Sequence, residues 1–372
     1  MKKINKKIFI ISNSYWNLYN FRYELIKKLS LSYDITLIGN YDETFNSFEG
    51  LNCEKLIINF PKNKINLIYD LKLLYNLYKI FKKFKPDILL NYTIKPVIYC
   101  SFLQFFFDFK VINTITGLGT LYLKNRLLKK IFISLYYFSQ KKVNKIIFQN
   151  IDDKDIFNDL KISNNSNSII IPGSGINTDY YKTNFYPSNK ITNFLFVGRL
   201  IKEKGIIELC NAFKSLNSNI KFKLTIVGLT DKKNPADVSD IIFNSIKKIK
   251  NVSIVLNEYD IKKYYENCHC LILPSYREGL SKSCLEAMSM SRPIIVSNVP
   301  GCRDLVFNKT NGLTFNHKNI NDIVNKIKYF IGISIDDKIK MGKFSRKYAI
   351  EYFSSKIIIN MYEEILLLKN EI

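Results

Sequence analysis

Hydrophobic residues in this chain follow two recurring patterns: short apolar runs, and longer segments with an apolar residue every three or four positions. Short apolar runs that stop at polar or turn residues predict buried strands, and the longer periodic segments predict amphipathic helices. Strands are therefore expected at residues 8–12, 33–39, 56–59, 86–90, 111–115, 145–149, 194–197, 223–228, 252–256, 271–273 and 293–297. Helices are expected at residues 20–30, 67–84, 205–216, 261–267, 283–290 and 354–369.

Expected strands alternate with helices in both halves of the chain. This order is typical of α/β proteins with Rossmann-like parallel sheets, in which ligands bind just past the carboxyl ends of the strands. The loops that follow the expected strands of the first half are therefore the first places to look for a site. They lie at residues 13–19, 91–96, 116–120 and 172–177.

The length of 372 residues predicts two domains. Residues 172–189 are polar and rich in Gly, Asn, Pro and Ser, so they are the expected linker. We therefore expect an N-terminal domain at residues 1–185, a C-terminal domain at 190–353 and a final helical segment at 354–372.

The most informative stretch is residues 271–301, which predicts a strand, a loop, a helix and a second strand. Ser281 is a suitable N-cap, and the backbone N–H groups of Gly279, Leu280 and Ser281 are expected to be unpaired at the helix start. Such an end binds anions and suits a diphosphate. Glu278 and Glu286 are better placed to accept hydrogen bonds from hydroxyls on either side of it. A nucleotide sugar has this layout.

A second loop carries matching positive charge. Gly198 and Arg199 follow the expected strand 194–197, and Lys204 stands just before the helix that starts at Gly205. If the two loops share one edge of a parallel sheet, these two cations can neutralise a diphosphate.

The segments REGLSKSCLEAMSMSRPIIVSNVPGCRDLV and FVGRLIKEKG resemble the donor site of the family 4 retaining glycosyltransferases, which have the GT-B fold of two facing Rossmann-like domains. The resemblance implies that Arg199 and Lys204 bind the donor phosphates. IVGLTDKKNP resembles the loop beside the nucleotide base, which implies that Gly228 and Asp231 lie near it. The last helix resembles the segment that crosses back to the first domain.

The resemblance covers nearly the whole chain. YNFRYELIKKL, NYTIKPVIYCS, VINTITGLGTLY, FQNIDDKDIF and IPGSGINTDYY are similar to the branch that builds capsule, O-antigen and lipid-linked glycans, where the acceptor is often a sugar on a polyprenyl diphosphate. Two departures stand out. The first loop holds Asn13 to Asn17 in place of a Gly-rich turn, and the only histidines, His269 and His317, lie in the second half. Whether Lys95 or Thr116 replaces the N-domain histidine of other members stays open.

The activity that these residues favour is retaining transfer of a hexose or N-acetylhexosamine from a nucleotide diphosphate sugar, expected to be UDP-linked, to a glycan acceptor. Glu286 would hold the ribose, and Glu278 would hold the donor sugar and stabilise positive charge on its ring. No metal or other cofactor is expected, because Arg199, Lys204 and the helix end can stabilise the leaving diphosphate. The acceptor side is expected to include Asn17, Thr93, Lys95, Thr116 and Gly117.

Two other functions compete with this interpretation. A GT-B epimerase would act on the same donor, but it needs an acid/base set in the cleft, and histidine is scarce here. A non-catalytic basic protein would bind a membrane or nucleic acid. No recognisable nucleic-acid module accompanies the basic residues, so we expect no nucleic-acid partner.

The net charge of +24, from 56 Lys and Arg against 32 Asp and Glu, is open to several explanations. Residues 121–142 mix basic with apolar and aromatic residues and fit a basic helix lying on an anionic membrane. A buried helix with a basic edge fits equally well, and part of the excess is explained by an AT-rich genome. No run of about 18 apolar residues is present, and the seven scattered cysteines favour a reducing compartment. We expect a cytoplasmic protein, with membrane attachment as a separate hypothesis.

Three short motifs suggest other chemistry. Residues 116–119, Thr-Gly-Leu-Gly, form half of a dinucleotide fingerprint, but the third glycine and the following acid are missing. Asp153-Lys154-Asp155 matches a metal motif of another glycosyltransferase fold, yet acids at this position also favour a helix start. Cys268-His269-Cys270 would alternate faces in a strand, so core packing is the expected role.

Overall fold

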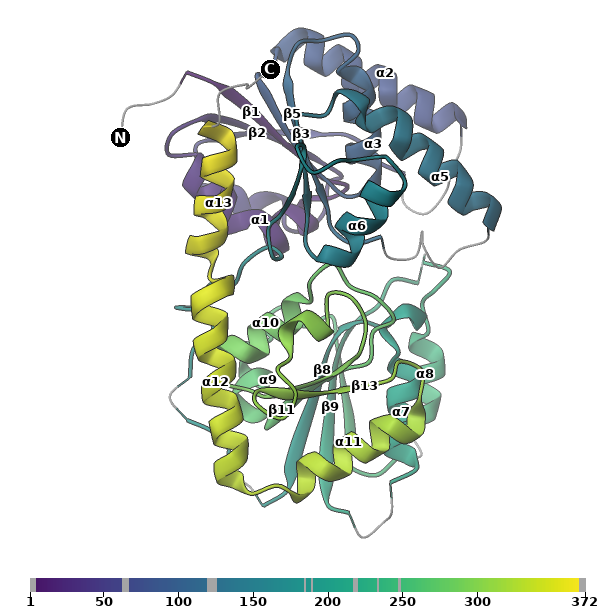
Figure 1. Ribbon diagram of the computed structural model, residues 1–372, viewed down its shortest axis with the longest axis vertical. Coiled ribbons are helices and arrows are strands. Elements are labelled where there is room, and N and C mark those ends of the chain that lie inside the picture. Colours follow the sequence, from purple (N-terminus) through teal and green to yellow (C-terminus); the bar gives the residue numbers. More distant parts are fainter. Residues whose placement is uncertain are drawn as a thin grey trace. The chain divides into compact units, whose positions relative to one another are not determined.

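The computed structural model describes residues 5–61, 67–118, 126–183, 185–188, 190–216, 220–232, 234–246 and 249–367 (Figure 1). The chain divides into two compact units. Unit 1 contains Met1–Ser174 and Ile358–Ile372, and unit 2 contains Gly175–Ile357.

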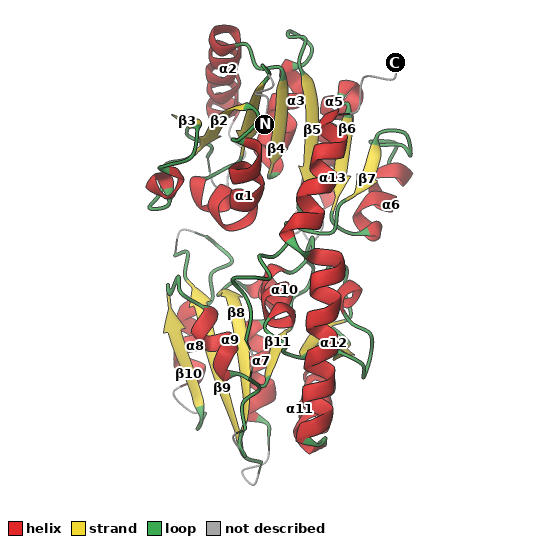
Figure 2. Cartoon of the chain, turned by 90° about the vertical axis from the view of Figure 1, so that its left-hand side faces the viewer, coloured by secondary structure: helices red, strands yellow, loops and turns green. Residues whose placement is uncertain are grey.

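The described strands of unit 1 form one parallel sheet in the order β3-β2-β1-β4-β5-β6-β7 (Figure 2). The strands are β1 (Lys7–Ile11), β2 (Asp34–Gly39), β3 (Cys53–Ile57), β4 (Ile88–Tyr92), β5 (Lys110–Ile115), β6 (Lys145–Phe148) and β7 (Ser168–Ile170). The helices are α1 (Tyr15–Leu29), α2 (Leu67–Phe84), α3 (Ile94–Leu103), α5 (Arg126–Ser139), α6 (Ile151–Asp159) and the end of α13 (Ser355–Leu367).

The sheet of unit 1 is covered on both faces, as its apolar strands predict. Along β1, Ile8 and Ile10 point into a core shared with α1 and α13, while Phe9 and Ile11 point into a core shared with α2, α3 and α5. Figure 1 shows α1 and α13 on one side of the sheet and α2, α3 and α5 on the other.

The described strands of unit 2 form a second parallel sheet in the order β10-β9-β8-β11-β12-β13. They are β8 (Thr192–Arg199), β9 (Phe222–Leu229), β10 (Val252–Leu256), β11 (Cys270–Leu273), β12 (Ile294–Ser297) and β13 (Gly312–Phe315). The helices are α7 (Ile206–Lys214), α8 (Ser239–Ile246), α9 (Lys262–Asn267), α10 (Lys282–Ser289), α11 (Ile320–Gly332) and α12 (Ile335–Phe353). Helix α7 packs against α8 and α11, and α10 packs against α12.

The alternating α/β pattern is confirmed, and the helix at 67–84 and the strand at 252–256 match their predicted bounds. Helix α1 starts at Tyr15, five residues before the predicted start, because Ser14 accepts a hydrogen bond from the Asn17 N–H and caps it. The strand expected at 56–59 lies at Cys53–Ile57, where it pairs with β2. The sequence analysis missed α3, α8, α11, α12, β7 and β13.

The boundary between the units lies at Gly175, earlier than the expected 185–190. The Ile176 N–H donates to the Phe353 carbonyl at 2.8 Å, and the Ser355 N–H donates to the Ile176 carbonyl at 2.9 Å. These bonds tie the start of the turn-rich segment to the end of α12, so this segment belongs to unit 2. The chain returns to unit 1 at Ile358, within α13.

Helix α13 is anchored in unit 1 by an apolar stripe and one buried hydrogen bond. Ile358, Ile365 and Leu366 are buried against the sheet. The hydroxyl of Tyr362, which is 1% exposed, lies 3.0 Å from Thr114 Oγ1 of β5. The C-terminal helix is therefore part of the core of unit 1.

Within the described residues, no helix is both long enough and apolar enough to cross a bilayer. All seven cysteines lie in described residues and are present as thiols.

The buried Tyr362 gives a first prediction. Replacing Tyr362 with Ala should lower the free energy of unfolding by about 3 kcal/mol, since a buried aromatic ring is lost. Tyr362→Phe should lower it by about 1 kcal/mol through loss of the Thr114 hydrogen bond. Denaturant unfolding followed by circular dichroism measures both. Tyr259→Ala, at a position 62% exposed, serves as the control, and a Tyr362→Ala effect no larger than that control would contradict the anchoring role.

Candidate functional site

The predicted donor residues lie at the carboxyl edge of the unit 2 sheet. Strands β8, β9, β11 and β12 run parallel, so their carboxyl ends share one edge. Gly198 pairs in register with Gly228, and Arg199 pairs with Leu229. The loops after β8, β9 and β11 therefore open from the same edge, as the sequence predicts.

A cation and an acid that the sequence predicts in two separate loops are in direct contact. Lys204 Nζ forms an ion pair with Glu278 Oε1, and the same oxygen accepts a hydrogen bond from Ser275 Oγ at 2.6 Å. The side chains of Lys204 and Glu278 are 19% and 15% exposed. The positive charge expected to bind a phosphate and the negative charge expected to face a sugar thus neutralise each other.

Two glycines allow these loops to approach closely. Gly205 has φ +66°, and a Cβ there would lie 2.0 Å from the Pro274 carbonyl oxygen at the end of β11. Gly301 has φ +76°, and a Cβ there would lie 2.5 Å from the Glu278 carbonyl oxygen. Another residue at Gly205 would push the Lys204 loop away from the β11 loop that carries Glu278, and another residue at Gly301 would push the loop after β12 away from Glu278.

The start of α10 differs from the prediction in one respect. Ser281 is the N-cap, as expected, and its Oγ accepts from the Cys284 N–H at 3.3 Å. The Ser281 N–H, which we expected to be unpaired, donates to the Gly301 carbonyl at 3.0 Å. That expectation is wrong because the turn at 299–301 lies against the loop. Leu280 packs partly buried against the core beside Gly279.

Glu286 is much more buried than a ligand-facing acid was expected to be. It is 4% exposed, and its Oε2 accepts a hydrogen bond from Tyr265 Oη at 2.7 Å. The Tyr181 hydroxyl faces this carboxylate and lowers its pKa, and Lys282 Nζ lies 3.7 Å from Oε1. Burial raises the pKa of Glu286, while Lys282 and the two tyrosine hydroxyls act in the opposite direction.

Glu278 and Glu286 both act on one buried thiol between them. Burial raises the pKa of Cys284 to about 12, the Ser281 hydroxyl lowers it, and the Glu278 and Glu286 carboxylates raise it further. Glu278 lies in the loop before α10 and Glu286 within the helix, so the two acids of the predicted motif lie on either side of its first turn.

The remaining donor-side residues lie at the ends of β8 and β9. Arg199 is exposed at the last position of β8. A Cβ at Gly228 would lie 2.7 Å from the Leu200 side chain, so glycine allows that residue to pack across β9. The Asp231 N–H donates to Asp237 Oδ2 at 2.8 Å and closes the loop expected beside the base.

On unit 1, two of the expected acceptor-side residues lie past the carboxyl ends of β1 and β4: Asn17 in the first turn of α1, and Thr93 just before α3. Asn17 Oδ1 accepts from Ser12 Oγ at 2.9 Å, and Thr93 Oγ1 accepts from the Asn13 N–H at 3.2 Å. Thr93 has φ +66°, an unusual backbone conformation for a β-branched residue. Strain of this kind is concentrated at functional sites.

The candidates for the missing histidine are held in different ways. Lys95 Nζ forms an ion pair with Asp70 Oδ1 of α2 at 2.8 Å, and its side chain is 20% exposed. Thr116 is half-buried after β5, and Gly117 has φ +102°. The ion pair with Asp70 occupies the Lys95 ammonium, so Thr116 has the less constrained polar group.

Two of the three short motifs that suggested other chemistry have structural roles. Asp153 is fully buried at the start of α6, and its Oδ2 accepts from the Leu118 N–H at 3.2 Å. Cys268, His269 and Cys270 are buried in the core of unit 2, and His269 Nδ1 accepts from the Asn193 N–H at 3.0 Å. Residues 119–125, which include Gly119 of the partial fingerprint, lie outside the described residues.

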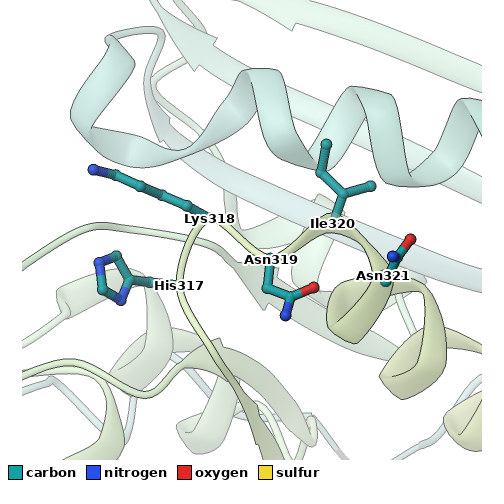
Figure 3. Close-up of a pocket in the computed structure, with 5 residues that line it drawn as sticks. All are labelled: His317, Lys318, Asn319, Ile320 and Asn321. Carbon is teal, nitrogen blue, oxygen red and sulfur yellow. The ribbon is translucent and has the colours of Figure 1, made fainter.

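An open hollow of about 520 Å³ lies beside the loop between β13 and α11 (Figure 3). Lys318 Nζ lies 4.5 Å from the ring centre of Tyr276, which joins this loop to the segment after β11. None of the predicted donor residues lines this hollow, so it lies outside the predicted site. Its lining residues are His317, Lys318, Asn319, Ile320 and Asn321.

Three residues that touch the predicted acids were missed by the sequence analysis. Ser275 contacts Glu278, and Tyr265 and Tyr181 contact Glu286. Ser275 precedes Glu278 by only three residues in a strand-end loop, so a turn-forming serine was a usable signal. Tyr181 and Tyr265 lie 105 and 21 residues from Glu286, and nothing local links them to it.

Comparisons with known proteins agree with this geometry. A family profile described as Glycosyl transferase 4-like matches residues 7–150, and one described as Glycosyl transferases group 1 matches residues 183–348. A Campylobacter jejuni relative, N,N'-diacetylbacillosaminyl-diphospho-undecaprenol alpha-1,3-N-acetylgalactosaminyltransferase, is 26% identical over 379 residues, which covers 96% of this chain and 97% of the relative.

An Escherichia coli relative, UDP-Gal:alpha-D-GlcNAc-diphosphoundecaprenol alpha-1,3-galactosyltransferase, is 28% identical over 307 residues, covering 78% of this chain and 77% of the relative. The solved structure of Anabaena HepE with UDP-glucose has a TM-score of 0.79 at 15% identity and covers 97% of this chain and 99% of its own. The matched profiles, the paired Rossmann-like units and the acid and cation loops lead to one conclusion. This chain belongs to the family 4 glycosyltransferases and has their GT-B fold.

Proposed function

We propose that this glycosyltransferase moves a hexose or N-acetylhexosamine from a UDP-linked donor to a sugar on a polyprenyl diphosphate, with retention of configuration and without a metal. The observation that carries the proposal is the meeting of Lys204, Ser275 and Glu278 at the carboxyl edge of the unit 2 sheet, beside the start of α10. The two relatives support the substrate class, because the names of both specify transfer to a sugar on diphospho-undecaprenol.

Each residue would have a distinct role at the donor. Arg199 and Lys204 would neutralise the negative charge that grows on the diphosphate as the glycosidic bond breaks. The N-terminal end of α10 would add its dipole, with Gly198, Gly279, Leu280 and Ser281 forming the walls of the phosphate site. Glu286 would accept hydrogen bonds from the ribose, and Gly228 would lie near the base.

Binding of the donor would exchange partners at Lys204. In the ligand-free chain Lys204 is paired with Glu278. A diphosphate carries more charge than one carboxylate, so the ammonium would move to the phosphate and release Glu278. The released acid would then accept a hydrogen bond from a donor-sugar hydroxyl and stabilise positive charge on the ring. The leaving phosphate would take the proton of the acceptor hydroxyl, which attacks from the same face.

The acceptor would bind over unit 1. Asn17 lies in the first turn of α1, the Asn13 N–H just before that helix donates to Thr93, and Thr116 and Gly117 follow β5. We assign the acceptor hydroxyl contacts to Asn17, Thr93 and Thr116, and a supporting role to Lys95 through its bond with Asp70.

A surface of unit 1 supports attachment to an anionic membrane, where a polyprenyl-linked acceptor would be found. Helix α5 leaves large apolar side chains exposed, and lysines lie over neighbouring rings: Lys142 Nζ is 4.8 Å from the Phe105 ring centre, and Lys141 Nζ is 5.0 Å from that of Phe138. Rings and cations together suit the interface of anionic lipids. This α5 face consists of Phe105, Phe106, Leu127, Lys130, Ile131, Tyr137, Phe138, Lys141 and Lys142. Residues 121–125 of the predicted basic segment lie outside the described residues.

Transfer is tested with UDP-sugars and a lipid-linked acceptor. Wild-type protein should form product, Glu286→Ala should mainly raise the donor KM, and Glu278→Ala should mainly lower kcat, by about 100-fold. Glu266→Ala, an exchange of a surface glutamate on α9, is the control. Formation of a sugar isomer from donor alone would favour an epimerase, and full transfer by both site variants would exclude the proposed roles.

The partner exchange at Lys204 makes an unusual prediction. Glu278→Gln should tighten UDP binding by about two- to fivefold while turnover falls, since a partly exposed ion pair contributes about 1 kcal/mol or less. Isothermal titration with UDP measures this. In a Lys204→Ala background the same substitution should have little effect on UDP affinity. An equal gain in both backgrounds would indicate plain charge repulsion and contradict the exchange.

Membrane attachment is tested by sedimentation with vesicles. Binding to vesicles containing anionic phospholipid should exceed binding to neutral vesicles and should weaken with salt. Lys141→Glu with Lys142→Glu should weaken it at least about tenfold, since each basic residue contributes about 1 kcal/mol. The matched control is Lys309→Glu with Lys318→Glu, the same charge change on exposed positions of unit 2. Binding that ignores both salt and anionic lipid would contradict the α5 face.

A further inference from the structure

The carboxylate of Glu286 lies in a pocket of side chains contributed by three separate segments. Tyr265 Oη of α9 donates to Oε2 at 2.7 Å, and the Tyr181 hydroxyl faces the carboxylate from the first segment of unit 2. Lys282 Nζ lies 3.7 Å from Oε1, one turn earlier on α10. The rings of Tyr181 and Tyr265 meet edge to face, with centroids 6.2 Å apart at 85°.

Tyr181 is fixed against α10 by its backbone. Its carbonyl accepts from Ser289 Oγ at 2.6 Å and from Arg346 Nη1 at 3.2 Å, and its N–H donates to the Asn177 carbonyl at 2.9 Å. Arg346 also donates to the Ser289 carbonyl. Because Ser289 ends α10, the helix that carries Glu286, the Tyr181 backbone is tied to that helix.

Tyr265 is fixed independently from the other side. It is fully buried, and its carbonyl accepts from Arg292 Nε at 2.8 Å. The same buried guanidinium donates through Nη2 to the Glu266 carbonyl at 2.9 Å. Arg292 therefore holds the end of α9 in place, and with it the Tyr265 hydroxyl.

An ionised carboxylate offers about four acceptor positions. The Tyr265 hydroxyl uses one of them and the Lys282 ammonium is paired with the other oxygen, so acceptor positions remain for the 2′ and 3′ hydroxyls of a ribose. The two tyrosine hydroxyls also set the plane of the carboxylate, since both are anchored to separately fixed backbone.

We propose that Tyr265 and Tyr181 are positioning residues of the donor site, whose hydroxyls keep the buried Glu286 carboxylate ionised and turned to receive the two hydroxyls of the donor ribose. This inference rests on the proposed function, since it assigns the ribose to Glu286. It adds Tyr181, from the segment after Gly175, to the residues that the sequence predicts for the donor site.

The positioning role of the two tyrosines predicts a change in the pH dependence of donor binding. Burial raises the pKa of Glu286, and Lys282, Tyr265 and Tyr181 lower it; the thiol of Cys284 also faces this carboxylate from α10. Removing one tyrosine hydroxyl therefore raises the pKa further. The carboxylate then takes up its proton at a higher pH as the solution is acidified, and a protonated acid offers fewer acceptor positions to ribose. Loss of donor affinity should begin at a higher pH.

The test compares Tyr265→Phe and Tyr181→Phe with Tyr264→Phe, a neighbouring tyrosine on α9 that serves as the matched control. Affinities for UDP and a UDP-sugar are measured by isothermal titration from pH 5 to pH 8, and steady-state kinetics are measured at pH 7.5. We expect donor Kd and KM to rise about three- to tenfold in each Phe variant, with kcat within about twofold of wild type. We also expect the acid limb of donor affinity to move to higher pH in each Phe variant, and Glu286→Gln to lack this limb.

The outcomes separate this inference from the proposed function. If wild-type protein binds no nucleotide sugar, both fail. If wild-type protein binds donor and Glu286→Gln weakens it, but neither Phe variant moves Kd or the acid limb beyond Tyr264→Phe, the positioning role alone is overturned. Should Tyr265→Phe fail to fold, as judged by its thermal unfolding midpoint, Tyr181→Phe decides the question, because its ring lies outside the fully buried core.

Discussion

The site of unit 2 depends on two places where backbone comes into contact with backbone. At Gly205 and Gly301, a single added carbon would lie 2.0 Å and 2.5 Å from a carbonyl oxygen of the β11 loop. These contacts bring the loop of Lys204 and the loop of Glu278 to the same point, and they also place the Gly301 carbonyl where it receives the Ser281 N–H. A phosphate site made from separate loops is only as well defined as the spacing between them.

Charge compensation explains why Lys204 is paired with Glu278. Lys204 and Glu278 are both largely shielded from water, and a shielded charge without a partner is costly. Their pairing lowers that cost until a ligand supplies a better partner for each. Glu286 solves the same problem differently, because neutral tyrosine hydroxyls stabilise its charge together with a longer ion pair to Lys282 at 3.7 Å. The two acids of one motif are therefore prepared in different ways for different hydroxyls.

Local pattern predicts what local interactions decide. The strand at 252–256, the helix at 67–84 and the Ser281 cap depend on neighbours within a few residues, and they lie where the sequence indicates. The contact between Lys204 and Glu278 follows from the parallel sheet, which the alternating strands and helices of the sequence also predict. Other contacts join residues far apart in the chain. They are the hydrogen bond from the Ser281 N–H to Gly301, the ion pair of Asp70 with Lys95, and the approach of Tyr181 to Glu286. No periodicity encodes those partners, so they could not be predicted.

The position of α13 has a consequence for the order of folding. One face of the first sheet is completed by Ile358, Tyr362, Ile365 and Leu366, which follow unit 2 in the chain. All of unit 2 is therefore synthesised before these residues. The core of unit 1 can be completed only after unit 2 has been made, although most of its strands are synthesised first.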